Sequence, residues 1–549
     1  MDTFDYVIVG AGSAGCVLAS RLSERPDTTV CLLEAGPRDW NPYIHVPAGF
    51  IKTFENSSVN WGYRQQPSAN VAGRRLLAPR GKTLGGSSAI NGHIYNRGQP
   101  LDFDNWAQMG NPGWSYADVL PYFKRMERRI GAGEDAYRGR DGALVVTDLG
   151  HRHPLCDAFL KSVQNLGIPL NPDYNGVSQT GVAYAQRTIH KGLRVTSATA
   201  FLRPAMRRPN LEVRTHAHAT EVLFEGRRAM GVRYRRGGRG GALREVRARR
   251  EVVLCGGAYN TPQLLELSGV GDPEILNAHG IRLRHALPGV GAGLQDHYAP
   301  RTVVRVKNMR TLNELSRGPR LALEVAKWLV ARRGILSLSP TLLYGAWHSG
   351  ATSEPCDIQF TFTPASYDEG VIGRLADTAG MTVAVWQQRP QSRGTVHISS
   401  ADPFAAPLID HHYLEAEEDQ RVLVAGMRLV RRMLAGEALR PYYDFEEFPG
   451  TGAQTDAELL DAARKKGNST FHPACSCAMG PAHDRGAVVD ASLKVHGLDG
   501  LRVADVSIMP SMISGNLNAA ALMIGDKAAD LILKGDQTSR IDEDKEHRC

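Results

Sequence analysis

A glycine-rich turn between an expected strand and an expected helix is the feature that most narrows what this chain can fold into. Residues 10–15 read Gly-Ala-Gly-Ser-Ala-Gly and directly follow the apolar, β-branched run Asp5–Val9. Apolar residues at helical spacing occupy Cys16–Leu22, and Thr29–Leu33 forms a second short apolar run. A G-x-G-x-x-G turn inside such a strand–helix–strand unit predicts a Rossmann-like domain that binds a dinucleotide.

The same unit predicts how the dinucleotide is held. Glycines let the backbone turn tightly and approach a pyrophosphate, while the start of the following helix offers unpaired N–H groups and partial positive charge. Glu34 stands just after the second run, nineteen residues beyond Gly15. A carboxylate there can accept hydrogen bonds from both hydroxyls of an adenosine ribose. These residues alone do not separate NAD from FAD.

Length and composition bound the remaining possibilities. The chain has 549 residues, 42% of them hydrophobic and 22% charged, so it can bury a large core and is not disordered in composition. We expect two or more domains, or one domain with large insertions. The net charge of +8 can favour anionic partners or a membrane surface, but it identifies neither.

Three features predict a cytoplasmic protein. The first residues lead straight into a strand, without the basic and apolar regions of a secretory signal. The sequence contains no run of about 18 apolar residues that would span a membrane. The eight cysteines are scattered rather than densely spaced, which is typical of a reducing compartment.

An arginine- and glycine-rich stretch, Arg233–Arg250, lies between β-like runs at 221–224 and 251–254, and a further run covers 211–213. We interpret the stretch as the solvated tip of a hairpin. An RNA-binding segment is the alternative, but regularly interleaved aromatic residues that would stack on bases are lacking. The sequence therefore predicts no nucleic-acid partner.

Further segments carry a family resemblance. Residues 81–92 read Gly-Lys-Thr-Leu-Gly-Gly-Ser-Ser-Ala-Ile-Asn-Gly, residues 294–297 read Leu-Gln-Asp-His, and residues 471–473 read Phe-His-Pro. With 257–271 and 502–518, these blocks follow the order of the signatures of the glucose–methanol–choline oxidoreductases. The chain resembles that family from residue 8 to about 530, and most of all its bacterial alcohol, sorbose and choline dehydrogenases. The resemblance selects FAD over NAD.

The resemblance implies an α/β fold with a Rossmann-like FAD-binding domain and an α+β substrate domain built on an antiparallel sheet and helices. Both domains are expected to be discontinuous. The FAD-binding parts are predicted at 1–155, 206–300 and 466–535, and the substrate parts at 156–205 and 301–465. Residues 536–549 are expected to form a C-terminal tail.

The glycine motif and the resemblance together predict the FAD-binding residues. Some family members attach FAD covalently to a histidine in the Gly-Gly-Ser-Ser block, but the matching residue is Ile90, so we predict non-covalent FAD. The predicted cofactor-binding residues are Gly10, Gly12, Ser13, Ala14, Gly15, Glu34, Ala35, Gly85, Ser87, Ser88, Asn91, Gly92, Ala219, Ala504, Asp505 and Asn516.

The resemblance implies that His472 and Asn516 are catalytic. An imidazole can accept the proton of an alcohol near neutral pH, and an amide can donate to the alcohol oxygen as negative charge develops. Without the resemblance, a histidine in a glycine-rich loop is more often structural, and an asparagine after glycine is most often a turn or cap. A helix is predicted from about 517 to 533, with a stop at Gly535, and its positive end is expected to face the flavin.

The same region contains Cys475, Cys477 and His483, which with His472 raise the possibility of zinc. The spacing is C-x-C without a second cysteine pair, so no metal is predicted. A disulfide between cysteines two residues apart would be strained, and buried free thiols are expected instead.

The substrate is predicted less sharply than the cofactor. A medium-chain or aromatic primary alcohol, oxidised to an aldehyde, is the first choice; choline or a sorbose-type polyol is the alternative. An oxygen-using oxidase or a hydroxynitrile lyase is a weaker one. Choline would need aromatic walls and a carboxylate; candidate aromatic residues are Trp347, Phe360, Phe362 and Trp386. The electron acceptor is expected to be a quinone or another carrier, and the oligomeric state is left open.

One basic segment, residues 317–333, is relevant to the identity of the electron acceptor. Leu321, Val325, Trp328 and Leu329 share one predicted helical face, and five basic residues flank them. The favoured interpretation is a helix that packs this face on the core. The alternative is peripheral contact with an anionic membrane, at the inner face of the cytoplasmic membrane, where electrons would pass to quinone.

Overall fold

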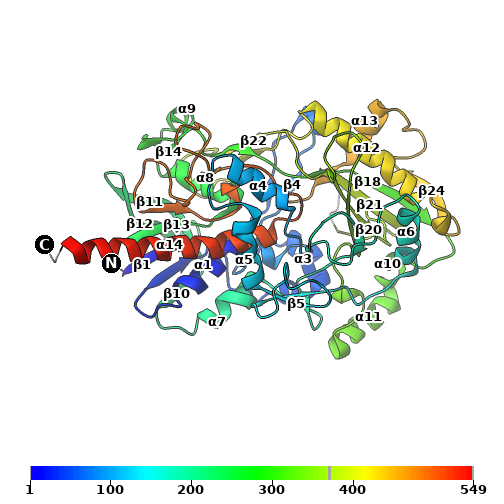
Figure 1. The fold of residues 1–549 in the computed structure, drawn as a ribbon, viewed down its shortest axis with the longest axis horizontal. Coiled ribbons are helices and arrows are strands. Elements are labelled where there is room, and N and C mark those ends of the chain that lie inside the picture. Colours follow the sequence, from blue (N-terminus) through cyan, green and yellow to red (C-terminus); the bar gives the residue numbers. More distant parts are fainter. Residues whose placement is uncertain (1, 369–372, 547–549) are drawn as a thin grey trace.

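The computed structural model describes residues 2–368 and 373–546 of the chain, with side chains up to residue 535. Two sheets, each with its own hydrophobic core, are arranged along the long axis of the molecule (Figure 1). This arrangement confirms the predicted α/β fold with a second, antiparallel sheet. The limits of the predicted domains stay a prediction.

The first sheet has seven strands and contains the predicted dinucleotide unit. Its parallel part has the order β10 (Leu211–Arg214), β2 (Val30–Leu33), β1 (Asp2–Val9), β13 (Ala242–Leu254) and β26 (Leu501–Val503). Val9 lies opposite both Leu33 and Leu254, and Leu254 lies opposite Val503. The carboxyl ends of four strands therefore meet at one edge, where α/β folds bind their ligands.

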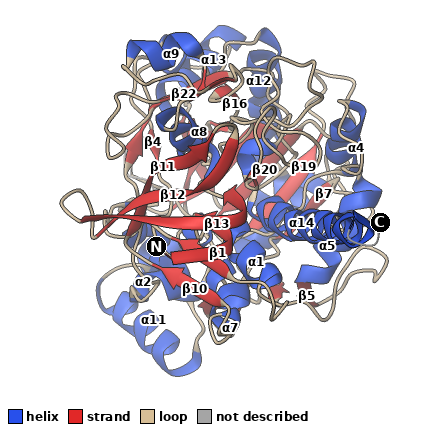
Figure 2. Cartoon of the chain, turned by 90° about the vertical axis from the view of Figure 1, so that its left-hand side faces the viewer, coloured by secondary structure: helices blue, strands red, loops and turns tan. Residues whose placement is uncertain are grey.

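An antiparallel arm completes this sheet. Strands β11 (Ala217–Glu225) and β12 (Arg228–Arg236) pair with each other, and β12 pairs with the first half of β13 (Figure 2). The predicted hairpin is confirmed, but its turn covers only residues 237–241. The rest of the arginine-rich stretch is strand, because residues such as Val246 are buried while the arginines alternate with them.

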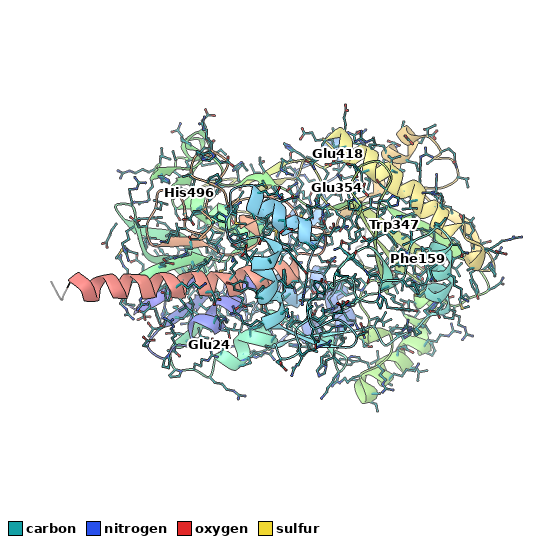
Figure 3. All side chains as sticks on the ribbon, viewed as in Figure 1. Glu24, Phe159, Trp347, Glu354, Glu418 and His496 are labelled. Atoms are coloured by element: carbon teal, nitrogen blue, oxygen red, sulfur yellow. The ribbon has the colours of Figure 1, made fainter. Side chains whose placement is uncertain are left out.

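The second sheet has six antiparallel strands in the order β24 (Tyr443–Phe448), β18 (Arg301–Val306), β21 (Gly380–Gln387), β20 (Ile358–Thr363), β19 (Leu343–Trp347) and β7 (Gly181–Tyr184). We call it the substrate sheet. Helices α12 (Glu417–Leu434) and α6 (Pro154–Gln164) cover one of its faces. Phe159 of α6, labelled in Figure 3, stacks on Phe362 of β20 with the ring centres 4.3 Å apart. The other face is left for the site.

A long helix lies at the C-terminal end and packs on the half that contains the first sheet. Helix α14 (Asn518–Glu546) runs along α1 (Ser13–Leu22), and a Cβ atom on Gly525 would lie 2.4 Å from the carbonyl oxygen of Ala14 (Figure 1). The predicted stop at Gly535 is wrong. A single glycine inside a helix costs only about 1 kcal/mol, which does not end a helix by itself.

The basic segment forms α11 (Gly318–Ala331), which stands out from the body of the protein (Figures 1 and 2). Trp328 is buried, and its indole N–H donates to the carbonyl of Gly192 at 2.9 Å. Leu329 and Leu321 of the predicted packing face are 61% and 37% exposed, so the prediction that this face packs on the core is only partly right. Among the described residues, no helix combines the length and apolar character needed to cross a bilayer.

Candidate active site

The glycine-rich turn lies at the edge where the parallel strands end. Gly10 has φ +103°, and a Cβ atom there would lie 2.5 Å from the carbonyl oxygen of Cys255, so only glycine fits. A Cβ atom on Gly15 would lie 2.0 Å from the carbonyl oxygen of Gly10, which lets α1 begin directly against the turn. The first turn of α1 thus presents its free N–H groups at the strand edge, as a pyrophosphate requires.

Glu34 follows β2 at the same edge. Its carboxylate accepts the backbone N–H of Ala11 at 3.0 Å and that of Gly36 at 2.8 Å, one on each oxygen. Burial raises the pKa of Glu34 to about 7, and these hydrogen bonds only partly oppose the rise. Each oxygen keeps one lone pair for a further donor, which fits the two hydroxyls of a ribose.

One cavity of about 430 Å³ extends from this edge to the substrate sheet. Most of the predicted cofactor residues line it, from the glycine turn at one end to Asn516 near the middle. The lining ones are Gly10, Gly12, Ser13, Ala14, Glu34, Ala35, Ser87, Asn91, Gly92, Ala219, Asp505 and Asn516.

Four predicted cofactor residues do not line the cavity: Gly15, Gly85, Ser88 and Ala504. They hold the lining loops in place instead. The N–H of Gly85 donates to Ala11 at 2.8 Å, the hydroxyl of Ser88 donates to Gly85 at 2.6 Å, and the N–H of Ala504 extends the sheet by donating to Leu254 at 2.8 Å. Their recorded contacts are thus with neighbouring backbone, and a part for them in binding the cofactor stays a prediction.

Asp505 follows β26 and organises the neighbouring helix start. One of its oxygens accepts the backbone N–H of Gly257 at 2.8 Å and the hydroxyl of Thr261 at 2.6 Å, both in α8 (Gly257–Leu267). The other accepts the N–H of Ser507 at 2.8 Å. The carboxylate that lines the cavity is thereby fixed in orientation.

The two predicted catalytic residues meet in the cavity, although 44 positions separate them in the chain. His472 comes from the loop after β25 (Asn468–Ser469), and Asn516 comes from the turn before α14. The amide nitrogen of Asn516 lies 2.9 Å from Nε2 of His472. An amide nitrogen can only donate, so Nε2 is the accepting nitrogen of the ring. Oδ1 of Asn516 is buried and has no partner among the described residues.

A chain of hydrogen bonds sets the same tautomer from the other side of the ring. The carbonyl of Gln388 can only accept, and Nε2 of His297 lies 2.8 Å from it, so His297 carries its hydrogen on Nε2. Its bare Nδ1 lies 3.0 Å from Nδ1 of His472, which must therefore be the donor. Thr470, whose hydroxyl donates to the backbone carbonyl of His297, accepts from the same Nδ1 at 2.9 Å.

The surroundings keep His472 neutral. Burial lowers its pKa well below the ordinary 6.5, and the nearby His297 and Arg80 lower it further. The backbone N–H of His472 donates to Asp296 at 2.7 Å, which fixes the loop. The ring is therefore an uncharged imidazole whose Nε2 lone pair accepts the hydrogen bond from Asn516.

Sequence reasoning missed the residues behind His472. The Leu-Gln-Asp-His block that supported the family resemblance contains both Asp296 and His297, so a signal was present, but nothing in it indicated what they touch. Gln388 takes part through its backbone carbonyl, which leaves no signature in the residue type.

At the far end, the cavity is lined by the substrate sheet. Trp386 is the only one of the four predicted aromatic residues that lines it; Phe360 and Phe362 lie in the core, and Trp347 packs against that core. Cys475 and Cys477 are buried free thiols, as predicted. Within the described residues, no group of three or more metal-binding side chains is placed to hold an ion.

Known proteins resemble nearly the whole chain. The family models of the N-terminal and C-terminal parts of GMC oxidoreductases match residues 4–299 and 390–525. An oxygen-dependent choline dehydrogenase of Staphylococcus aureus is 40% identical over 541 residues, covering 96% of this chain and 93% of the relative.

Two solved structures are also similar to this chain in fold over nearly its whole length. Pyridoxine 4-oxidase from Mesorbium loti is 30% identical with a TM-score of 0.86, covering 96% of this chain and 98% of its own. A formate oxidase is 25% identical with a TM-score of 0.90, covering 98% and 99% of the two chains.

Proposed function

Because the chain belongs to the GMC oxidoreductase family and is thus an FAD-dependent alcohol oxidoreductase, we propose that it oxidises a primary alcohol to an aldehyde with His472 as the base. The observation that carries this proposal is the 2.9 Å contact between Asn516 and Nε2 of His472 inside the cavity. The residues around the cavity fit FAD: a turn that only glycine can form, a buried carboxylate with free lone pairs, and the start of α1.

Oxidation of an alcohol removes a proton from oxygen and a hydride from carbon. Bound FAD supplies the acceptor for the hydride. The alcohol hydroxyl replaces the amide of Asn516 as the donor to Nε2 of His472, and its proton passes to that lone pair, since the ring hydrogen is held on Nδ1. The amide of Asn516 then donates to the alcohol oxygen as it becomes negative, and the start of α14 adds partial positive charge nearby.

We propose that FAD is held without a covalent bond, because Ile90 has no nucleophile. His93, three residues further on, provides a sharp test. Its ring lines the cavity, is 1% exposed, and has no partner among the described residues on either nitrogen. Acid precipitation should leave the yellow colour in the supernatant; colour in the pellet that His93→Ala releases would place a covalent link on His93.

For the acceptor, we propose a quinone reached through peripheral contact of α11 with a membrane. Leu323 and Val330 are 57% and 88% exposed on this helix, and Arg320 and Arg333 flank them. An outward apolar side bordered by cations is the pattern of a helix that lies in a membrane interface. The chain also runs from the end of α11 to the cavity-lining Pro340 within nine residues.

Anaerobic bleaching of the flavin tests the function itself. Purified protein should lose its flavin absorbance when a primary alcohol is added, and the matching aldehyde should appear in equal amount. A secondary alcohol of the same length and the aldehyde itself are the controls. Bound flavin that no alcohol in a broad panel bleaches would contradict the proposal.

A further inference from the structure

Arg301, the first residue of β18, faces the cavity. It lies directly opposite Ala384 of β21, which in turn lies opposite Thr361 of β20. Opposed residues of antiparallel strands point to the same side of a sheet, and all three of these residues line the cavity. This row of the substrate sheet therefore presents one guanidinium group to the substrate end of the site.

No carboxylate of residues 2–368 or 373–535 is recorded in an ion pair with this guanidinium. Among the described residues, its only recorded contact is with the ring of Tyr367, whose centre lies 5.1 Å from the guanidinium carbon. Arg97 is paired with Glu127, and Arg389 with Asp102. The buried Arg187 and Arg194 also lack a carboxylate, but they donate to backbone carbonyls, whereas Arg301 has no recorded hydrogen bond of its guanidinium among the described residues. Burial of Arg301 lowers its pKa, in keeping with a charge that is not compensated.

A second side chain at this end also lacks a partner. Gln359 is fully buried, lines the cavity two residues before Thr361, and has neither its amide nitrogen nor its amide oxygen bonded among the described residues. The indole N–H of Trp386, directly opposite Gln359, is likewise unpaired. Buried polar groups without partners are costly, so these donors indicate a polar ligand that satisfies them.

The charge of the lining gives the sign of that ligand. The carboxylates that line the cavity in the described part of the chain are Glu34 and Asp505, and both stand at the strand edge where FAD fits. The substrate end therefore has a cation and several donors without a carboxylate to balance them. A quaternary ammonium such as that of choline would meet a like charge there.

We propose that Arg301 binds a carboxylate carried by the alcohol substrate, so that the preferred substrate is a hydroxy acid rather than choline. This inference rests on the proposed function. Trp386 lies beside His297, with ring centres 6.4 Å apart, and the row of Arg301 is the next one along β21. Rows on one face of a sheet are about 7 Å apart. Several atoms must then separate the carbinol from the carboxylate, as in 4-(hydroxymethyl)benzoate.

The test compares 4-(hydroxymethyl)benzoate, benzyl alcohol and choline in wild-type enzyme and in Arg301→Met, which keeps the length of the side chain but not its charge. We expect the wild-type enzyme to prefer 4-(hydroxymethyl)benzoate. Arg301→Met should lower the kcat/KM for this substrate about 100-fold, mainly by raising KM. The kcat/KM for benzyl alcohol should change by less than about threefold, because benzyl alcohol has no carboxylate that could pair with Arg301. Arg301→Lys should restore part of the loss.

Two measurements separate this inference from a folding defect. Arg305→Met, on the same strand but paired with Glu447 instead of facing the cavity, is the matched control and should leave both substrates unchanged. Benzoate, which cannot be oxidised, should inhibit wild type competitively and Arg301→Met far less.

Two results would overturn the inference while the proposed function stands. One is an equal loss of kcat/KM for 4-(hydroxymethyl)benzoate and benzyl alcohol in Arg301→Met; the other is a wild-type preference for choline. A flavin that none of the three alcohols bleaches, in a protein that also fails with other alcohols, would overturn both.

Discussion

Nδ1 of His297 lies 3.0 Å from Nδ1 of His472, and the carbonyl of Gln388 on the far side of His297 decides which of the two rings donates. A backbone carbonyl thus controls, through two imidazoles, which nitrogen of His472 is left to accept a proton. His297 acts by positioning, because its own hydrogen bonds go to Gln388 and to His472.

Replacing His297 by leucine should remove this control. Nδ1 of His472 would keep only the hydroxyl of Thr470 as its acceptor. The ring would then spend part of its time as the other tautomer, with the hydrogen on Nε2, and part of its time with Nε2 turned away from the cavity. We expect kcat to fall about 10- to 100-fold, as when a group that orients a metal-bound histidine is removed. Stopped-flow reduction of the flavin is the measurement, and the flavin spectrum reports intact binding. Unchanged reduction rates would show that the contact does not matter.

The acid limb of kcat/KM should lie below pH 6.5. His472 works in its neutral form, and burial lowers its pKa well below the ordinary value, so acid converts it to the inactive cation only at a pH under 6.5. A profile measured with an uncharged alcohol avoids titration of the substrate. A limb at pH 7 or above would mean that the base is another group or that His472 is not shielded.

Binding of FAD should weaken as the pH falls through 7. The pKa of Glu34 is raised to about 7 without ligand, and ribose hydroxyls that donate to its carboxylate favour the charged form. FAD binding below that pH must therefore expel a proton. Calorimetric titration of the apoprotein in two buffers of different ionisation enthalpy measures the proton released. Glu34→Gln is the control and should bind weakly at every pH, and a wild-type affinity that is level from pH 6 to 8 would count against the role of Glu34.

Helix α11 should bind anionic vesicles through its outward apolar side. Leu323→Glu with Val330→Glu should abolish sedimentation with vesicles that contain phosphatidylglycerol, since the two carboxylates replace apolar side chains that are 57% and 88% exposed. The pair Leu243→Glu with Leu283→Glu, on exposed leucines far from α11 in the chain, is the matched control. Equal binding by all three proteins would contradict membrane contact through α11.

The FAD end of the site could be predicted because its signals are local. The backbone at Gly10 admits no side chain, and Glu34 follows a strand at a fixed distance from the turn, so a few neighbouring residues suffice. The pairing of His472 with Asn516 depends on distant segments, and only the order of several family blocks indicated it.

The features that could not be predicted depend mainly on the direction in which side chains point after the chain has folded. Apolar residues occur around most of α11, so periodicity did not select the outward side that carries Leu323 and Val330. Arg301 is an unremarkable strand residue in the sequence, and only its row in the substrate sheet directs it into the cavity. Gly535 is a helix breaker by residue type, yet the helix continues through it.

The central claim is that Nε2 of His472 takes the proton of the alcohol, and single-turnover reduction of the flavin in His472→Ala tests it most directly. We expect a protein with normal flavin absorbance whose reduction by a primary alcohol is at least about 100-fold slower than in wild type. Added imidazole should restore part of the rate. Reduction at nearly the wild-type rate, with the flavin in place, would contradict the account.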